Sequence, residues 1–292
     1  MGQQVINGFF LGSIYALFAV GYTLVFGVLD ILNLAHQAVF MLGAFCALAL
    51  VGGLHLSFAL ALPLAVLFSG AVGILLDRLA FRPLRGRADS NMSGLISSIA
   101  AATIFEAIAL QVFGPDVSRF PFDTFPDRQL SVAGAVVSTL QLSIVAVSVM
   151  LMIVLTYLLR KTRLGRQIRA VAESPRAARI LGINVDRVIA ASFFISSALG
   201  GAAGVLFALA FNNLSPDMGR SVELKGLAVI ILGGMGSVTG AVTAGFAIGL
   251  IEVFTVAYLG SSYRDAVSFA VLFLVLLVWP RGLFGRVALR EA

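Results

Sequence analysis

The chain is divided into long apolar runs separated by short polar stretches. Most runs contain about 20 residues, the length of an α-helix that spans the hydrocarbon core of a bilayer. The pattern predicts spans at roughly 5–28, 34–52, 55–77, 92–113, 137–159, 188–210, 238–258 and 264–279, placed to within about two to four residues. We therefore expect an all-α polytopic membrane protein with about eight transmembrane helices, forming one transmembrane domain over residues 1–292.

Composition supports a membrane protein and argues against a soluble one. Hydrophobic residues make up 60% of the chain and charged residues 12%, and the mean hydropathy is +1.02. Soluble domains carry about 25% charged residues. The pI of 10.1 indicates basic cytoplasmic loops rather than a nucleic-acid partner. The single cysteine, Cys46, offers neither a disulfide pair nor a metal framework.

The basic residues predict which loops face the cytoplasm. Three groups contain most of them: Arg78, Arg82, Arg85 and Arg87; Arg160, Lys161, Arg163, Arg166, Arg169, Arg176, Arg179 and Arg187; and Arg281, Arg286 and Arg290. By the positive-inside rule these regions are cytoplasmic. The segments 114–136, with Asp116, Asp123 and Asp127, and 211–222 then lie outside. We expect an outside N-terminus and a cytoplasmic C-terminus.

The count of crossings predicts a break in residues 223–240. The span 188–210 ends outside and the last span begins outside, so the chain must enter and return between them. A short apolar piece at 224–232 is followed by LGGMGSVTGA and by a full span. Because the entering arm is short, we expect the reversal to lie at membrane depth, where non-helical backbone is tolerated only inside protein or beside a water-filled cavity.

The reversal contains a group of small residues that we predict to matter. They are Gly233, Gly234, Gly236, Ser237 and Thr239. Glycine permits unusual dihedrals and close helix approach, so these residues either pack helices or line a pathway, and the two roles overlap. The group lacks the lysine of a phosphate-binding loop and the surrounding βαβ unit.

A second break is predicted near residues 30–37, in VLDILNLAHQAVF. Asn33, His36 and Gln37 fall between two spans with no basic residue nearby. A structural hydrogen-bonding role for His36 and a role in a pathway both remain open. Two broken segments, one in each half, suggest an inverted repeat of the transporter kind.

Two acidic residues, Glu106 and Glu252, fall within predicted spans. Ionisable groups in a bilayer are costly and are candidates for function. The alternative is that each carboxylate extends to the nearer outer surface or bonds to a neighbouring hydroxyl. No series of titratable residues connects them to the inside as a proton relay would require.

The cytoplasmic segment 160–187 contains a predicted short helix. Ser174 is a typical N-cap, Pro175 a first helical residue and Gly182 a C-terminal stop, with Arg176, Ala177, Ala178 and Arg179 in the body. A helix this short needs a surface to be stable. That surface is either the lipid headgroups or a cytoplasmic partner, and we favour the partner.

Three blocks resemble a known family. ILNLAHQAVFMLGAF, AARILGINVDRVIAASFFISSALGGAAGVL and KGLAVIILGGMGSVTGAVTAGFAIGLIE are similar to permease subunits of ABC importers for branched-chain amino acids, in particular the smaller, H-type subunit. The likeness covers most of the chain. Two positions depart from the family pattern: Gln37 stands where Gly is common, and Arg176 stands where the coupling motif of many importers has Glu.

The resemblance implies an import complex. The chain would pair with a second homologous permease subunit and with two ATP-binding cassette subunits, and a periplasmic binding protein would deliver leucine, isoleucine or valine. The helix around Ala177, Ala178 and Gly182 would couple the chain to an ATPase. No catalytic residue, metal or cofactor is expected in the chain itself.

Other functions stay open. Close relatives serve urea and short amides. An autonomous secondary transporter would need intramembrane charges for ion coupling, which are scarce here, and would have no need of segment 160–187. A membrane enzyme would need a catalytic dyad or metal set within the spans, and the sequence offers neither.

Overall fold

The computed structural model describes residues 1–85, 90–121, 124–132, 135–280 and 282–285. Within this part of the chain the α-helices are α1 (Gly2–Leu29), α2 (His36–Leu48), α3 (Phe58–Leu76), α4 (Ser90–Phe113), α5 (Thr139–Lys161), α6 (Arg163–Glu173), α7 (Pro175–Ile180), α8 (Val185–Phe211), α9 (Met218–Gly233), α10 (Val238–Tyr258) and α11 (Arg264–Val278). Eight helical segments are long and apolar enough to cross a membrane, which confirms the predicted spans. The predicted loop residues Arg87, Asp123, Arg281, Arg286 and Arg290 lie outside the described residues.

Short irregular helical turns extend several of these elements. π-helical turns follow α2 at Ala49–Gly53 and α3 at Asp77–Phe81, and 3-10 turns occupy Arg82–Leu84 and Ser261–Tyr263. The predicted outer loop contains a small antiparallel hairpin, β1 (Gln129–Val132) and β2 (Ala135–Ser138), with Gln129 opposite Ser138. The hairpin is a minor addition to the predicted all-α fold.

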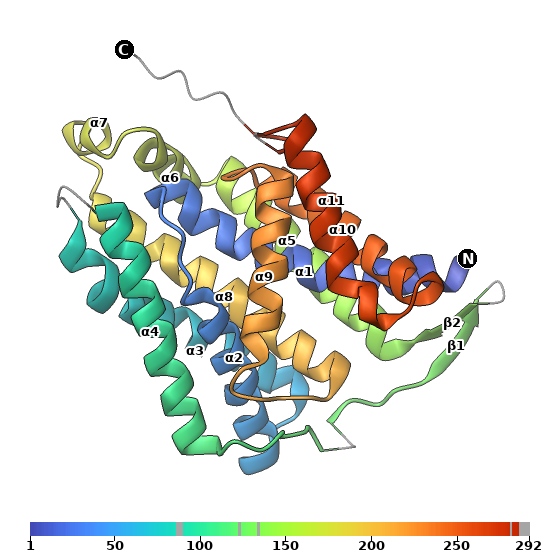
Figure 1. Ribbon diagram of the computed structural model, residues 1–292. Helices are drawn as coiled ribbons and strands as arrows, with labels where there is room; N and C mark the ends of the chain where they lie inside the picture. The colour runs from blue at the N-terminus through green and yellow to red at the C-terminus, as the bar shows by residue number, and fades with distance from the viewer. Residues whose placement is uncertain (86–89, 122–123, 133–134, 281, 286–292) are drawn as a thin grey trace.

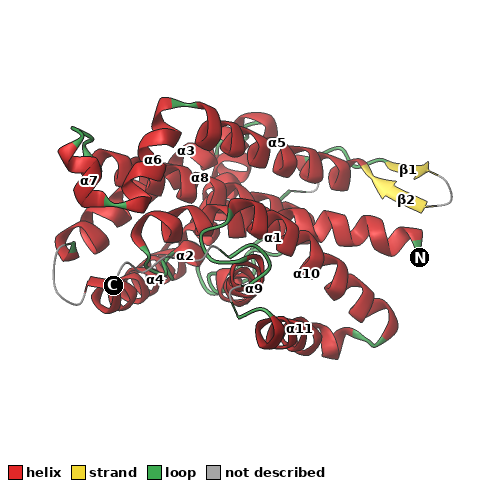
Figure 2. Ribbon diagram, turned by 90° about the horizontal axis from the view of Figure 1, so that it is seen from above, coloured by secondary structure: helices red, strands yellow, loops and turns green. Residues whose placement is uncertain are grey.

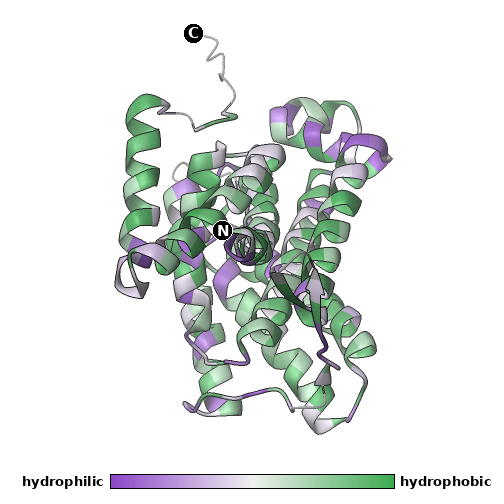
Figure 3. Ribbon diagram, turned by 90° about the vertical axis from the view of Figure 1, so that its right-hand side faces the viewer, coloured by the Kyte–Doolittle hydropathy of each residue, from purple (hydrophilic) through white to green (hydrophobic). Residues whose placement is uncertain are grey.

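The bundle has two distinct ends (Figure 1). The N-terminus and the hairpin lie at one end, which we call the hairpin end, and α6 and α7 lie at the other, which we call the α7 end. Gln3 bonds to the hairpin through the Val136 backbone, so α1 begins at the hairpin end. Hydrophobic residues cover most of the bundle, whereas hydrophilic residues gather in the short helices at one end (Figure 3).

Helix α1 lies at the centre of the fold (Figure 2). Together with α2 and α8 it separates a layer containing α3 and α5 from one containing α4, α9 and α11. It packs most extensively against α10 and α8. Gly12 and Gly249 bring the backbones of α1 and α10 together, since a Cβ on Gly249 would lie 2.4 Å from the Gly12 Cα. Glycine pairs of this kind let a long central helix be surrounded by others on all sides.

The second break differs from its prediction in depth. α9 and α10 do reverse through Gly234–Ser237, as predicted. However, Gly236 lies beside Gly27 near the last turn of α1, and the Leu283 and Phe284 amides donate to the Leu232 and Gly233 carbonyls. The reversal therefore lies at the α7 end, level with the ends of α1 and α11. The expectation of a reversal at membrane depth is therefore wrong. α9 begins at Met218, about six residues before the predicted apolar piece, so the helix is long enough to reach the α7 end.

Candidate functional site

The first break lies deep inside the bundle. α1 ends at Leu29, and Asp30 ends it in a left-handed conformation with φ of 54°. The chain then runs back along the bundle, and α2 begins at His36 (Figure 1). The His36 ring contacts Phe18, with centroids 4.8 Å apart, and this phenylalanine is three turns before the end of α1. At 1.5 Å per residue, α2 begins roughly 15 Å from that end.

Hydrogen bonds from neighbouring residues hold the irregular backbone of the first break. The Asn33 side-chain oxygen accepts from the Ala35 amide at 3.2 Å, and its carbonyl accepts from the His36 amide at 3.1 Å. The Leu34 amide donates to the Ser98 hydroxyl of α4 at 3.1 Å. Asn33 thus closes a turn on which α2 starts, a common use of this side chain. Non-helical backbone at this depth is tolerated because protein surrounds it.

His36 is fully buried among aromatic rings and glycines. Its ring meets Tyr22 edge-on at 5.4 Å, and a Cβ on Gly200 of α8 would lie 2.6 Å from its Cε1 atom. Neither ring nitrogen has a hydrogen-bond partner of good geometry, although the Phe18 backbone carbonyl is near. His36 therefore joins α1, α2 and α8 at the middle of the bundle, in a space that glycine makes available.

Gln37 lies in the first turn of α2 and needs no glycine at its own position. The close approach comes from the partner helix instead. A Cβ on Gly219 of α9 would lie 2.4 Å from the Gln37 carbonyl oxygen. The glycine that is common at position 37 in the family is therefore dispensable for the helical geometry here.

The region around the first break contains an unusual number of polar atoms without partners. Within the described residues, the buried atoms without a hydrogen bond include Tyr22 Oη, Asn33 Nδ2, both His36 ring nitrogens, Gln37 Oε1 and Glu223 Oε1. Buried polar groups in proteins are nearly always paired. Unpartnered groups gathered at one place indicate a site for water or for a polar ligand.

Sequence reasoning did not find Tyr22 or Glu223. Glu223 fell at the edge of the predicted short apolar piece, whereas the structure places it in the second turn of α9. The usable signal was the spacing of Gly219, Glu223 and Gly226, which puts one acid between two small residues on one helix face.

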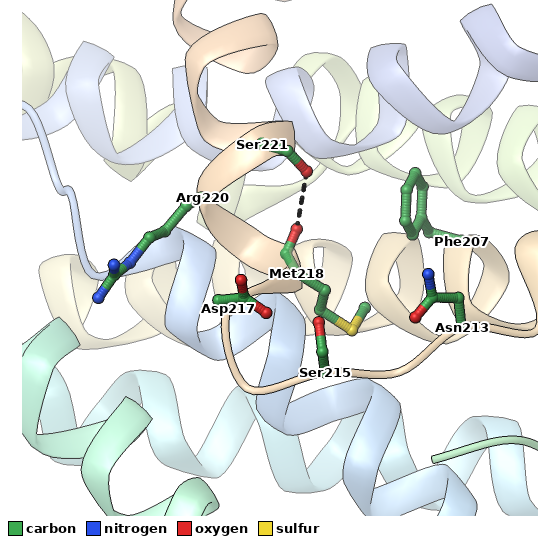
Figure 4. A pocket seen from close by; sticks show the side chains of 7 residues that line it. All are labelled: Phe207, Asn213, Ser215, Asp217, Met218, Arg220 and Ser221. Carbon is green, nitrogen blue, oxygen red and sulfur yellow. Dashed lines mark hydrogen bonds between the residues drawn. The ribbon is translucent and has the colours of Figure 1, made fainter. Parts of the chain in front are cut away.

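A pocket of about 350 Å³ adjoins the first turn of α9 (Figure 4). It is lined by Phe207, Asn213, Ser215, Asp217, Met218, Arg220 and Ser221. Figure 4 shows Asn213 and Ser215 on the segment before α9, and Arg220 extending away from the others. The pocket is polar along this segment and lies about one turn from Glu223.

The predicted residues of the second break form a tight structural turn. Gly234 and Gly236 have φ of 97° and 83°, which favour glycine. A Cβ on Gly233 would lie 2.4 Å from the Gly240 carbonyl carbon, so α9 and α10 touch through backbone. Ser237 caps α10 by accepting from the Gly240 amide at 3.1 Å. Thr239 is exposed in the first turn of α10.

Glu106 forms an ion pair near the hairpin end. Arg220 Nη2 lies 2.5 Å from Glu106 Oε2, which connects α4 with the first turn of α9. The arginine is largely exposed and the glutamate is mostly buried.

Glu252 lies in a buried cluster of charges. It accepts from the Tyr15 hydroxyl at 3.1 Å, which is the predicted bond to a hydroxyl. It also pairs with Lys225 Nζ at 2.9 Å and with Arg264. Lys225 in turn lies 3.2 Å from Asp265. This cluster joins α1, α9, α10 and α11, and the sequence did not reveal it because its members are far apart along the chain.

The predicted short helix forms as α7. The Ser174 hydroxyl accepts from the Ala177 amide at 3.2 Å, Pro175 opens α7, and the Gly182 amide donates to the Arg179 carbonyl. Gly182 has φ of 80°. Among the body residues Ala178 is buried, while Arg176, Ala177 and Arg179 are exposed. Ile180 is 81% exposed, so α7 presents a surface that the described residues leave uncovered.

Comparisons with known proteins agree with one another. The family model described as branched-chain amino acid transport system / permease component matches residues 4–276. The high-affinity branched-chain amino acid transport system permease protein LivH of Escherichia coli (strain K12) is 36% identical, over 97% of this chain and 95% of its own length. BraD of Pseudomonas aeruginosa, a permease protein of the same description, is 34% identical over the same shares. PsaBC from Streptococcus pneumoniae, solved in complex with Fab, shares the fold with a TM-score of 0.50 at 12% sequence identity. The match covers 92% of this chain and 89% of the PsaBC chain.

Proposed function

The chain belongs to the family of branched-chain amino acid transport system permease components, and from that membership we propose that it forms half of the translocation pathway of an ABC importer for leucine, isoleucine and valine. The observation that carries the proposal is the likeness to named branched-chain permeases along nearly the whole of both chains. The fold agrees, because eight spans surround a polar break at mid-depth.

We propose the following partners for the complex. A second homologous permease subunit completes the pathway, two ATP-binding cassette subunits hydrolyse ATP, and a periplasmic or extracellular binding protein delivers the amino acid. The chain has no catalysis of its own and binds no cofactor. It acts as one permease domain in the inner (plasma) membrane of a bacterium or archaeon, with the N-terminus outside and the C-terminus in the cytoplasm. The basic residues of α6 and α7 support that orientation.

We propose α7 as the coupling helix. Its contacts within the chain are with α6 and α8. The loop from α7 to α8 contains only residues 181–184. A movement of α7 would therefore move α8, and with it Gly200, which faces His36. The exposed surface of α7, with Ile180 and Arg176, would enter a groove of an ATPase subunit.

The pathway is proposed to pass the first break. Asn33, His36 and Gln37 lie there, and the positive end of the α2 dipole suits a carboxylate. Gly233, Gly234, Gly236, Ser237 and Thr239 form the framework of the α9–α10 turn near the cytoplasmic end of that pathway.

Uptake of radiolabelled leucine by cells carrying the whole operon tests the proposal. Isoleucine, valine and urea serve as competitors, and Gly182→Pro is compared with wild type. We expect uptake that isoleucine and valine inhibit and that the variant loses while membrane levels hold. Competition by urea alone would assign a different substrate in the same family. Uptake without the ATPase genes would indicate an autonomous transporter.

A further inference from the structure

Glu223 differs from the other acids within the helical bundle in the described part of the chain. Glu106 pairs with Arg220, Glu252 with Lys225 and Arg264, and Asp77 with Arg85. Only 8% of the Glu223 surface is exposed, and Glu223 forms no ion pair with any described residue. A buried carboxylate without a cation is costly. A cation supplied by a ligand would offset that cost.

The position of Glu223 follows from its helix face. Gly219, Glu223 and Gly226 are spaced four and three residues apart and so share one face of α9. Gly219 rests on the Gln37 backbone, and a Cβ on Gly226 would lie 2.3 Å from the Phe18 ring. Glu223 therefore faces the space between the first turn of α2 and the Phe18 ring of α1.

The groups around that space are polar and unpartnered. The Tyr22 hydroxyl lies one turn along α1 from Phe18, on the same face, and is buried without a hydrogen bond. The Gln37 side-chain oxygen is likewise without a partner. Both can accept a hydrogen bond from a cation.

We propose that Glu223, with Tyr22 and Gln37, receives the primary ammonium group of the amino acid as it passes the first break. The inference deepens the proposed function and rests on it, because it names the site for one end of that substrate. A carboxylate neutralises an ammonium, whereas the neutral urea molecule would leave the buried charge uncompensated. The site therefore selects α-amino acids over urea and short amides.

The test uses the complete complex in proteoliposomes, with leucine-loaded binding protein at saturation. Two rates are measured, leucine uptake and ATP hydrolysis. For Glu223→Gln we expect uptake to fall about 10- to 100-fold, the loss expected for a hydrogen bond to a charged group, while ATP hydrolysis stays within about twofold. Ser148→Ala is the matched control, because it removes another buried, unpartnered polar group, in α5. It should leave both rates unchanged.

Two results would overturn the proposal. One is Glu223→Gln uptake within about twofold of wild type. The other is an equal fall of uptake and ATP hydrolysis in an intact complex, which indicates a structural role. If the wild-type complex hydrolyses ATP but takes up no branched-chain amino acid, the proposed function itself fails, and the site loses its substrate with it.

A second variant covers the case in which Glu223→Gln does not assemble. Tyr22→Phe removes one hydroxyl and keeps the ring that packs against His36. We expect uptake to fall about 3- to 10-fold with ATP hydrolysis retained. Unchanged uptake in an assembled Tyr22→Phe complex would also overturn the proposal.

Discussion

The two breaks in this bundle are built in opposite ways. The first, Asp30–Ala35, runs through the interior, is held by side chains such as Asn33 and Ser98, and is surrounded by polar atoms without partners. The second, Gly234–Ser237, lies at the α7 end and is closed by backbone contacts between glycines. Unsatisfied polar groups are costly, whereas glycine packing is stable. We therefore propose that the first break serves transport and the second serves architecture.

The largest loss of stability is expected from a substitution in α9 or α10, the two helices that the second break connects. Lys225 of α9 and Glu252 of α10 form a buried pair, and removing Lys225 takes away the more buried of the two cations that pair with Glu252, leaving Arg264. We expect Lys225→Met to destabilise the folded chain by about 3–5 kcal/mol. Thermal unfolding in detergent measures the change. The double variant Lys225→Met with Glu252→Gln should recover part of it, and an undiminished loss in the double variant would contradict the pairing.

Two glycines of the second break should respond unequally. Gly234 and Gly236 both have positive φ, but a Cβ on Gly234 would lie 2.4 Å from the Gly285 backbone amide nitrogen, whereas a Cβ on Gly236 would meet only the Gly27 Cα, at an ordinary contact distance of 3.8 Å. Leucine at either position incurs backbone strain of about 1–2 kcal/mol. Overpacking adds about 1–3 kcal/mol at Gly234 alone. We expect Gly234→Leu to reduce assembled complex in the membrane more strongly than Gly236→Leu. Equal losses would show that packing there is unimportant.

Adding a methyl group beside His36 at the first break should cost less stability, and a double-mutant cycle measures the effect directly. Gly200→Ala places a methyl group 2.6 Å from the His36 ring and should cost about 1–3 kcal/mol. His36→Ala removes the obstacle, so the double variant should be more stable than the sum of single losses predicts. Unfolding temperatures of the four proteins give the coupling energy. Additive losses would mean that Gly200 and His36 do not share the space.

Two side-chain bonds provide the smallest change and the closest comparison. Asn33→Ala removes the side-chain bond to the Ala35 amide in the turn before α2, and Ser237→Ala removes the N-cap bond to the Gly240 amide of α10. Each should cost about 1 kcal/mol of stability. Because only Asn33 lies in the proposed pathway, leucine uptake should fall clearly more in Asn33→Ala. Similar uptake in both variants at similar membrane levels would contradict the distinction between the breaks.

Features that depend on local sequence could be predicted well. The spans follow from run length, and the cap, first proline and stop of α7 follow from Ser174, Pro175 and Gly182. The positions of both breaks also follow, because Asn33, Gly234 and Gly236 interrupt apolar runs. The inverted repeat stays a prediction.

Features that depend on helix packing could not be predicted. The depth of each break is set by where its neighbours lie, which a linear pattern does not contain. Glu223 lies at the edge of the predicted apolar piece 224–232 and Lys225 lies within it, so the apolar pattern did not mark either residue as part of a site. The partners of Glu252 come from three other helices, so no spacing rule along the chain connects them.

Accessibility of single cysteines tests the central claim most directly. Cys46 is replaced by serine, and Gln37→Cys and Ser237→Cys are made separately in the assembled complex. A membrane-impermeant thiol reagent is added from the outside during ATP-driven turnover, with and without leucine-loaded binding protein. We predict that Gln37→Cys reacts during turnover and is protected by leucine, while Ser237→Cys does not react from this side. Labelling of Ser237→Cys with protection by leucine, and none of Gln37→Cys, would show that the second break is the pathway.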